Sequence, residues 1–221
     1  MTRLVIAIDG PSGAGKGTVS RSIADTLGYR HLDTGAMYRA VGWKALQEGV
    51  ALDEEPAVAA LAQRADIIVE GGVVSIDGHD VTRAIRTPEI DRAAAAVARL
   101  PRVREVLVAR QRVLGEPGGV VMEGRDIGTV VFPNADLKVY LDASAEERAR
   151  RRAHDAAHTG SQAGQAAVAA AIQARDTSDT TRTVSPLTPA PDAVHIDTTG
   201  MPINEVVERV LTLVRAKLAA V

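Results

Sequence analysis

The sequence contains no cysteine and few aromatic residues, and its charges nearly balance. Without cysteine, the 221-residue chain can form neither disulfides nor thiolate metal sites, and it has no cysteine nucleophile. Aromatic residues make up 2% of the chain, which is too few for the stacking surfaces that bind single-stranded nucleic acids. The formal net charge of −2 leaves no broad basic field, so we expect neither a nucleic-acid nor a membrane partner.

Long hydrophobic runs are also absent. The first apolar run, residues 4–8, is too short for a signal-peptide core or a membrane span, so we expect a cytoplasmic protein. Apolar residues nevertheless make up 46% of the chain, which is ample material for a core. The length fits one large domain, or one domain with insertions.

The order of apolar segments predicts an α/β fold with a central parallel sheet of about five strands. Helical stretches separate these segments, and strands that alternate with helices favour a parallel sheet with right-handed crossovers. The expected strands are residues 4–8, 31–32, 119–122, 137–141 and 193–196.

Helix signals lie between these strands. We expect a helix from about Lys16 to Leu27 that stops at Gly28. Residues 144–147 have the form of a capping box, which predicts the start of a basic helix. A last amphipathic helix should begin near Pro202 and pack against the sheet.

Two stretches interrupt the alternation. Residues 67–81 predict two or three short strands joined by Gly-Gly and Asp-Gly turns, which would form a small β insertion. Residues 154–182 are rich in Gly, Ser, Thr and Ala, and they predict a mobile cover over a binding site.

Residues 10–16 read Gly-Pro-Ser-Gly-Ala-Gly-Lys and have the composition of a phosphate-binding loop. Glycines let backbone N–H groups wrap a polyphosphate, and the following helix N-terminus adds a positive dipole. Lys16 can reach the β- and γ-phosphates, and we expect its side chain to face solvent until they arrive. An ordinary strand-to-helix turn is the alternative. The residues assigned to this site are Gly10, Pro11, Ser12, Gly13, Ala14, Gly15, Lys16, Gly17 and Thr18.

A second candidate anion site follows at residues 33–39. Tyr38 and Arg39 place a hydroxyl donor and a guanidinium side by side at an early helix turn. Arg39 is suited to a phosphate because a guanidinium can donate two parallel hydrogen bonds. A surface helix start with a half-buried tyrosine would give the same pattern.

Polar residues also follow the strand expected at residues 119–122. Ligands bind at the C-terminal ends of strands in open α/β sheets. Glu123 could therefore hold Mg²⁺ through water, Arg125 a phosphate, and Asp126 the amino group of a base. A solvated turn with a salt bridge is the alternative.

Further charged residues flank the predicted cover. Arg175 and Asp179 are four residues apart, which places them on one helix face, where a stabilising surface pair is the simpler interpretation. Arg148, Arg151 and Arg152 first indicate a solvated basic face. The five histidines lack metal-ligand spacing, so we assign them no role.

Together these motifs closely resemble the bacterial cytidylate kinase family, a family of P-loop nucleoside monophosphate kinases. The matching segments are residues 10–18, 33–39, 101–105, 124–133 and 175–182. The resemblance implies one kinase domain over residues 1–221. Its parts would be a core (1–35, 101–147 and 183–221), a monophosphate-binding insertion (about 36–100) and a lid (about 148–182).

The resemblance also implies how CMP is held. Tyr38, Arg39 and Arg125 would hold its phosphate, and Arg182 would reach the phosphate region. Thr34 occupies the place of a small hydroxyl residue of the family.

The base and ribose would be held by four further residues. Arg104 and Asp126 would read cytosine, while Arg175 and Asp179 would reach the ribose. The sequence departs from the family at Ala95, where a serine that contacts the base is expected.

The implied activity is ATP-dependent phosphorylation of CMP, and of dCMP, to the diphosphate, as a step of pyrimidine nucleotide metabolism. Phosphoryl transfer depends on positioning and charge neutralisation, and an anionic phosphate acceptor needs no strong base. Lys16, Arg125, Arg148 and Arg151 are the expected catalytic residues, with Arg152 as a further candidate. Mg²⁺ would accompany ATP, close to Thr18 and to Glu123, which would act through water. We expect a monomer.

Two other functions remain open at this point. One is a kinase of another small acceptor, against which the motifs at residues 33–39 and 124–126 argue. The other is a P-loop switch that hydrolyses ATP slowly, which should lack the second anion pocket indicated by Arg39, Arg125 and Arg182.

Overall fold

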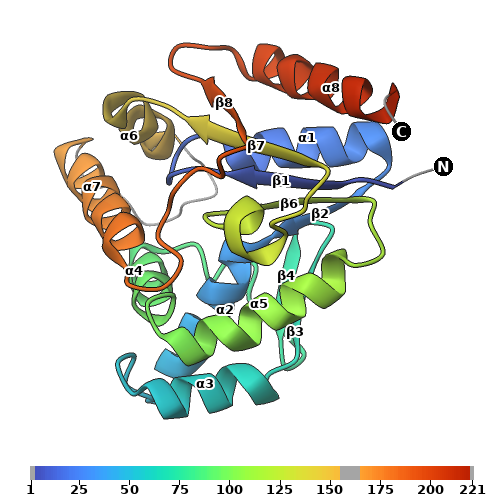
Figure 1. The fold of residues 1–221 in the computed structure, drawn as a ribbon. Helices are drawn as coiled ribbons and strands as arrows, with labels where there is room; N and C mark the ends of the chain where they lie inside the picture. The colour runs from blue at the N-terminus through green and yellow to red at the C-terminus, as the bar shows by residue number, and fades with distance from the viewer. Residues whose placement is uncertain (1–2, 155–164, 220–221) are drawn as a thin grey trace.

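A computed structural model describes residues 3–154 and 165–219 and places a five-stranded sheet at the centre of the molecule (Figure 1). The strand order is β2-β6-β1-β7-β8, and all four neighbouring pairs are parallel. The strands are β1 (Val5–Asp9), β2 (Arg30–Asp33), β6 (Val120–Gly124), β7 (Leu137–Asp142) and β8 (Val194–Asp197). The prediction of a parallel α/β sheet is confirmed, and the strand ends differ from the expected ones by one or two residues.

Helices cover both faces of this sheet (Figure 1). On one face lie α1 (Lys16–Leu27) and α8 (Ile203–Ala219), and on the other lie α2 (Thr34–Gln47), α5 (Pro101–Gly115) and the short π-helix η1 (Ile127–Val131). The predicted stop of α1 is confirmed, because Gly28 adopts the left-handed conformation and its N–H donates to the carbonyl of Ala24.

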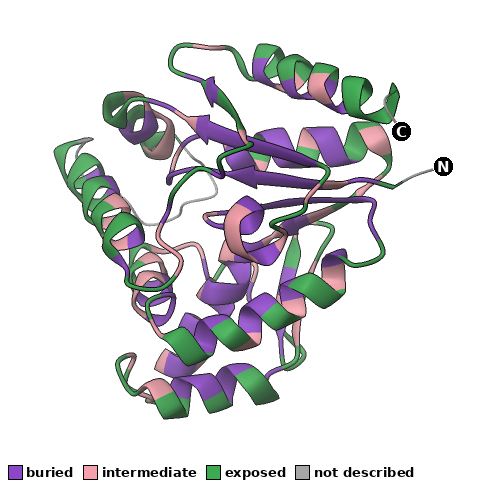
Figure 2. Ribbon diagram, viewed as in Figure 1, coloured by how far each residue is buried: buried purple, intermediate pink, exposed green. Residues whose placement is uncertain are grey.

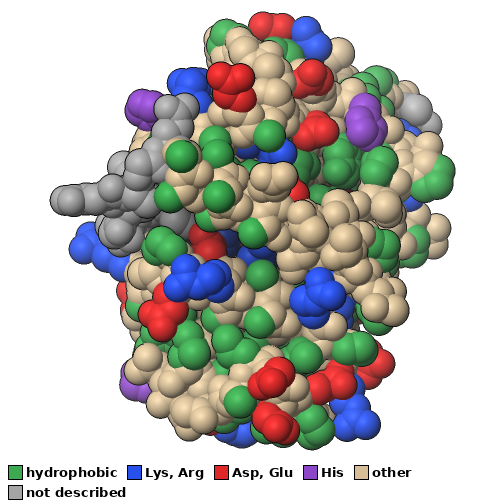
Figure 3. Space-filling view, turned by 90° about the vertical axis from the view of Figure 1, so that its left-hand side faces the viewer, with side chains coloured by type: hydrophobic (Ala, Val, Ile, Leu, Met, Phe, Trp, Pro, Cys, Tyr) green, Lys and Arg blue, Asp and Glu red, His purple; other side chains and the backbone are tan. Residues whose placement is uncertain are grey.

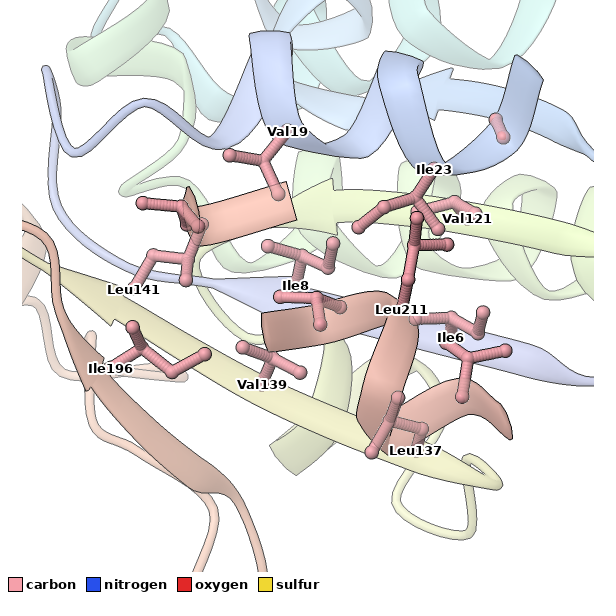
Figure 4. Close-up of a cluster of buried hydrophobic side chains, with 14 of the residues drawn as sticks. Ile6, Ile8, Val19, Ile23, Val121, Leu137, Val139, Leu141, Ile196 and Leu211 are labelled. Carbon is pink, nitrogen blue, oxygen red and sulfur yellow. The ribbon is translucent and has the colours of Figure 1, made fainter. Parts of the chain in front are cut away.

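The core follows from the alternation of side chains along β1. Leu4, Ile6 and Ile8 point toward α1 and α8, whereas Ala7 points to the opposite layer with Met122. Figure 4 shows the first layer, in which side chains of the strands meet those of the two helices. The three middle strands β6, β1 and β7 are purple along most of their length in Figure 2, as expected for strands buried on both faces, whereas the edge strands β2 and β8 are more exposed.

The chain between α2 and α5 forms a separate lobe below the sheet in Figure 1. Its antiparallel sheet has three short strands in the order β3-β4-β5, so the predicted β insertion is confirmed. The elements of this lobe are α3 (Glu55–Arg64), β3 (Ile67–Glu70), β4 (Val73–Ile76), β5 (His79–Asp80) and α4 (Pro88–Val97).

Two helices stand at one side of the sheet, α6 (Ala145–Ala153) and α7 (Gln165–Thr181). The predicted cap of α6 is confirmed, because Ser144 Oγ accepts from the N–H of Glu147 at 3.2 Å. The predicted mobile cover falls partly on residues 155–164, which lie outside the described residues. In the described part of the chain, every helix is too short or too polar to cross a bilayer.

Candidate functional site

A cavity of about 1260 Å³ opens at the carboxyl ends of the central strands. It is lined by the loop between β1 and α1, the start of α2, the end of β6 and the charged residues of α6 and α7. On the face shown in Figure 3, Lys and Arg side chains lie at the surface, and small blue areas are also visible deeper between other atoms. The expected site residues that line the cavity are Ser12, Gly13, Ala14, Gly15, Lys16, Gly17, Thr18, Thr34, Tyr38, Arg39, Arg104, Glu123, Arg125, Asp126, Arg151, Arg175 and Arg182. Arg152 lines it too, whereas Gly10, Pro11, Arg148 and Asp179 lie behind the lining.

The loop between β1 and α1 is a tight turn that requires glycine. A Cβ at Gly10 would lie 1.9 Å from the carbonyl oxygen of Leu141, at a φ of +147°. Gly15 is the N-cap of α1 and adopts the left-handed conformation. No side chain caps this end of the helix with a hydrogen bond. The first N–H groups of α1 therefore remain available to an anion, as the sequence predicted.

Lys16 is buried, which corrects the expectation that it faces solvent. Its side chain folds back along the loop, where Nζ donates to the carbonyl of Pro11 at 2.8 Å. Only 6% of the residue is exposed. Burial, with a smaller contribution from the cation of Arg125, lowers the pKa of Lys16 to about 7.

Asp9, at the end of β1, is a site residue that the sequence analysis missed. Its carboxylate accepts from the N–H groups of Ile127 and Gly128, both at 2.8 Å. Burial raises the pKa of Asp9 to about 6. Asp9 thus fixes the start of η1. This start lies directly after Asp126 in the chain and beneath the cavity. Its position at a strand end before the glycine-rich loop was the only signal.

The start of α2 places Arg39 among carboxylates. Asp33 Oδ1 accepts from the N–H of Ala36 at 3.1 Å and so caps the helix. Arg39 Nε donates to Asp91 Oδ1 at 3.1 Å, and Arg39 Nη1 lies 3.9 Å from Asp33 Oδ2. Tyr38 is buried on the next face of the same helix. The structure therefore contradicts the alternative of a surface helix start.

A buried polar pocket lines the cavity away from the glycine-rich loop. Arg104 and Asp126 form an ion pair there, Arg104 Nη1 donates to Tyr38 Oη at 3.3 Å, and Arg182 Nη2 lies 3.7 Å from Asp126 Oδ1. Arg104 Nε and Arg182 Nη2 are buried donors without a hydrogen-bond partner among the described residues. Such donors indicate a place for acceptor atoms of a ligand. Ala95 does not line the cavity.

The hydroxyl of Tyr38 stays protonated in this pocket. Burial raises the pKa of Tyr38 to about 12, while the cation of Arg104 opposes that rise. Because the phenol is neutral at physiological pH, it can donate as well as accept a hydrogen bond.

Arg125 and Arg175 converge on one carboxylate. Arg125 Nε donates to Asp179 Oδ2 at 2.8 Å, and Arg175 Nε lies 3.2 Å from both carboxylate oxygens of Asp179. Although burial opposes it, the two guanidinium groups lower the pKa of Asp179. The pair of Arg175 and Asp179 exists, but Asp179 is 2% exposed, so the interpretation as a surface pair was wrong.

Three arginines of α6, Arg148, Arg151 and Arg152, point toward the glycine-rich loop and its surroundings instead of solvent. Arg148 donates to the carbonyl of Ser12 at 3.2 Å and to Asp176 Oδ2 at 2.5 Å. Arg152 Nη2 donates to Ser12 Oγ at 2.7 Å, and Arg151 Nη2 donates to the carbonyl of Thr198 at 2.6 Å. The interpretation as a solvated basic face was therefore wrong for these three residues.

The sequence analysis gave no role to several partners in this region. Asp176 and Thr198 hold the α6 arginines, but both come from segments far along the chain. Arg21, Arg83 and Arg86 also line the cavity, at its rim. They lie outside the recognised motifs, which is why the sequence analysis left them out.

The residues expected near a metal present only oxygen atoms to the cavity. Thr18 is exposed and Glu123 is nearly buried, and both line the cavity beside the loop. His31, to which the sequence analysis assigned no role, lies with Nε2 at 2.9 Å from Glu123 Oε1. Residues 3–154 and 165–219 contain no group of three or more His, Asp or Glu that could hold a metal by itself. Oxygen donors suit Mg²⁺, which usually keeps several waters and binds with substrate phosphates.

Comparisons with known proteins indicate the family of the chain. The family model described as cytidylate kinase matches residues 6–216. A cytidylate kinase of Desulforamulus reducens is 52% identical, over 95% of this chain and 96% of that protein. A cytidylate kinase of Desulfitobacterium hafniense is 50% identical, over 97% of this chain and 94% of that protein. A solved gluconokinase from Sinorhizobium meliloti 1021 superposes with a TM-score of 0.51 at 18% identity, over 99% of this chain and 93% of that chain, and shows the fold alone.

Proposed function

The chain belongs to the cytidylate kinase family, and on this premise we propose that its cavity transfers the γ-phosphoryl group of ATP to the phosphate of CMP. One observation supports the roles that we propose for individual residues. The cavity joins a phosphate loop at one end to a buried pocket of Arg104, Asp126 and Tyr38 at the other. One polyphosphate and one base therefore have separate places in a single chamber, formed by one chain.

The donor end holds ATP by its phosphates. The unpartnered N–H groups at the start of α1 and the backbone of residues 10–15 surround the β- and γ-phosphates. Lys16 then exchanges the carbonyl of Pro11 for a phosphate oxygen. Arg151 stands beside this loop, because its Nη1 lies 3.4 Å from the carbonyl oxygen of Ala14.

The acceptor end holds the phosphate of CMP. Arg39, Arg125 and Arg182 each have donors near the cavity, and each is anchored on one side by a protein acceptor. An arginine anchored in this way presents its remaining N–H groups in a fixed direction. Asp179 and Arg175, which are bonded to each other, reach the ribose from α7. The hydroxyl of Thr34 donates to the carbonyl of Glu123 at 2.7 Å, which fixes the side chain of Thr34 at the wall of the cavity.

In the reaction, an oxygen of the CMP phosphate forms a bond to the γ-phosphorus of ATP. The bond from that phosphorus to the bridging oxygen of ADP breaks, so the products are CDP and ADP. The attacking oxygen is already anionic, so no general base is required. Lys16, Arg125, Arg148 and Arg151 offset the charge on the transferring group.

Mg²⁺ suits the oxygen atoms at this end of the cavity. When bound with ATP, it supplies positive charge to the β- and γ-phosphate oxygens. Thr18 would lie close to it, and Glu123 would reach it through water. His31 fixes one carboxylate oxygen of Glu123, which leaves the other to accept from such a water.

We place the parts of the domain as the sequence suggested. The monophosphate-binding insertion covers about 36–100 and the lid about 148–182, around a core of 1–35, 101–147 and 183–221. The insertion and the lid contact each other, because Arg99 Nη1 donates to the carbonyl of Ser178 at 3.3 Å. Contact between these parts supports closure of both over bound nucleotides.

A coupled assay of ADP release tests this function. With ATP and Mg²⁺, we expect rapid ADP release on addition of CMP, a comparable response to dCMP, and much weaker responses to UMP and AMP. Without any acceptor, ADP release should be slow, because water is excluded as the cleft closes. An equal rate without acceptor would indicate a hydrolytic switch. A clear preference for another monophosphate would contradict the assignment of the base pocket.

ATP binding should depend on pH through Lys16. Its pKa is about 7 in the free protein, so it is charged below pH 7 and loses its proton above. Phosphates favour the charged form, so binding above pH 7 must take up a proton, and ATP affinity should fall by up to about tenfold per pH unit there. Calorimetry in two buffers of different ionisation enthalpy should show proton uptake at pH 8 and little at pH 6.

Lys16→Arg is the matched control for this measurement. A guanidinium keeps its charge at both pH values, so the Lys16-linked proton uptake at pH 8 should disappear. Equal proton uptake by both proteins at pH 8 would show that another group titrates.

A further inference from the structure

Asp91 is an acidic residue at the centre of the arginines that surround the cavity. It lies in the first turn of α4, after the N-cap Thr87. Its carboxylate oxygen Oδ1 accepts from Arg39 Nε at 3.1 Å, and Oδ2 lies 4.0 Å from Arg152 Nη1. Its backbone carbonyl accepts from Arg175 Nη1 at 2.8 Å. One residue therefore contacts three arginines of the site.

These arginines come from three different helices. Arg39 belongs to α2 at the base of the insertion, Arg152 to α6 and Arg175 to α7. Asp91 itself lies on α4, which packs against α2 on one side and approaches α7 on the other. Contacts of Asp91 thus connect the insertion with both helices of the lid.

Asp91 bonds to the Nε atom of Arg39, and this choice of nitrogen matters for phosphate binding. Asp91 engages Nε, and the nearest other carboxylate, Asp33, is 3.9 Å from Nη1, beyond hydrogen-bond distance. The two terminal nitrogens of Arg39 can therefore donate in parallel to an incoming phosphate. A guanidinium already held in place loses less conformational freedom when it binds.

Asp91 also offsets the repulsion among the arginines. Burial and the cations of Arg125 and Arg39 lower the pKa of Arg175, and the carboxylates of Asp179 and, to a smaller extent, Asp91 act in the opposite direction. Before nucleotides supply negative charge, the convergence of these cations needs a counter-charge inside the protein. Asp91 supplies it between the insertion and the lid.

We propose that Asp91 is a positioning residue, which orients Arg39 for the phosphate of the acceptor and couples acceptor binding to donor binding through Arg152 and Arg175. The coupling follows because the three arginines share one residue. A phosphate bound by Arg39 also strengthens the contact of α4 with α7, which favours closure of the donor side. The proposal rests on the proposed function, since it assigns to Arg39 the phosphate of CMP.

The test compares Asp91→Asn with Glu89→Gln, a matched loss of one negative charge on the same helix. Glu89 is exposed, with no ion pair among the described residues. For Asp91→Asn, we expect KM for CMP to rise by about tenfold, as for the loss of one charge-assisted hydrogen bond, with a smaller change in kcat. Glu89→Gln should match the wild type.

A binding measurement separates positioning from a merely structural role. The affinity for CMP is measured with and without a non-hydrolysable ATP analogue, and the ratio of the two gives the coupling factor. Asp91→Asn should lower this factor severalfold, whereas Glu89→Gln should not change it. Asp91→Glu keeps the carboxylate, so its KM and coupling factor should lie closer to the wild type than those of Asp91→Asn.

Three outcomes would overturn the inference. They are equal behaviour of Asp91→Asn and Glu89→Gln, tighter binding of CMP by Asp91→Asn, and an Asp91→Glu variant as impaired as Asp91→Asn. If Asp91→Asn does not fold, the comparison of Asp91→Glu with the wild type still decides, because a severalfold loss of the coupling factor in Asp91→Glu would exclude rescue by the carboxylate. Failure of the wild type to phosphorylate CMP would instead contradict the proposed function.

Discussion

Replacement of Lys16 by alanine should lower turnover by about 10²–10³-fold, since a charged donor to the transferring group is lost. The buried position of Lys16 strengthens this expectation. Its ammonium group lies under the loop at 2.8 Å from the carbonyl oxygen of Pro11, so a small movement brings it to a phosphate of ATP. Among the described residues that line the cavity, Lys16 is the only lysine.

The variant should keep its fold. Lys16 makes one hydrogen bond to the backbone, and its burial costs solvation of a charge, so the free energy of unfolding should change little. Thermal unfolding checks this point. Lys217→Ala, at an exposed position near the end of α8, is the control and should have wild-type activity. Near-normal turnover of Lys16→Ala would mean that the loop does not bind the transferred phosphate.

The second large effect concerns the choice of base, which Asp126 should decide. Cytosine presents an amino group that a carboxylate can accept from, whereas uracil presents a carbonyl that a carboxylate repels. Arg104 can donate to the carbonyl and the ring nitrogen of cytosine, but uracil carries an N–H at that nitrogen. A mispaired polar group in a desolvated site can discriminate by roughly 10⁴-fold. Asp126 is 6% exposed, so this end of the site is largely desolvated.

Asp126→Ala should therefore lower the ratio of kcat/KM for CMP to that for UMP, with a smaller effect on ATP binding. Its ion pair with Arg104 is buried, and breaking such a pair costs about 3–5 kcal/mol of stability. Asp126→Asn keeps the shape of the side chain, and its amide can turn to donate to the carbonyl of uracil, so it should gain activity with UMP.

Kinetics with both monophosphates in the wild type and both variants measure this effect. Glu105→Gln, an exposed acidic position on α5, is the control for loss of one negative charge. Thermal unfolding shows how much of any loss is due to stability. A CMP to UMP ratio unchanged in both variants would move base recognition to other residues.

Much of the site could be predicted from local sequence because the decisive physics is local. A strand followed by a glycine-rich turn and a helix binds phosphate through backbone groups of consecutive residues, so residues 10–18 indicate a phosphate site without knowledge of the rest. The capping box at Ser144 and the stop at Gly28 follow from hydrogen bonds within a few residues. Strand alternation likewise predicted the parallel sheet, because only a buried sheet needs strands that are apolar on both faces.

Charge pairing could not be predicted in the same way. Arg39 bonds to Asp91, 52 residues away, and Arg148 to Ser12, 136 residues away. Any of many acidic residues could have been their partners, and a sequence contains no distances between them. For the same reason the sequence suggested a solvated face for the α6 arginines, whereas packing turned them toward the loop.

The sequence by itself determined the family, the sheet and the phosphate loop, since each depends on short-range geometry or on motifs in order. Only the tertiary structure decided the burial and the pKa of individual side chains. Burial lowers the pKa of Lys16 to about 7, and burial raises the pKa of Asp9 to about 6 although the hydrogen bonds from Gly128 and Ile127 oppose the rise. Burial depends on which segments meet in space, and local sequence patterns do not specify that meeting.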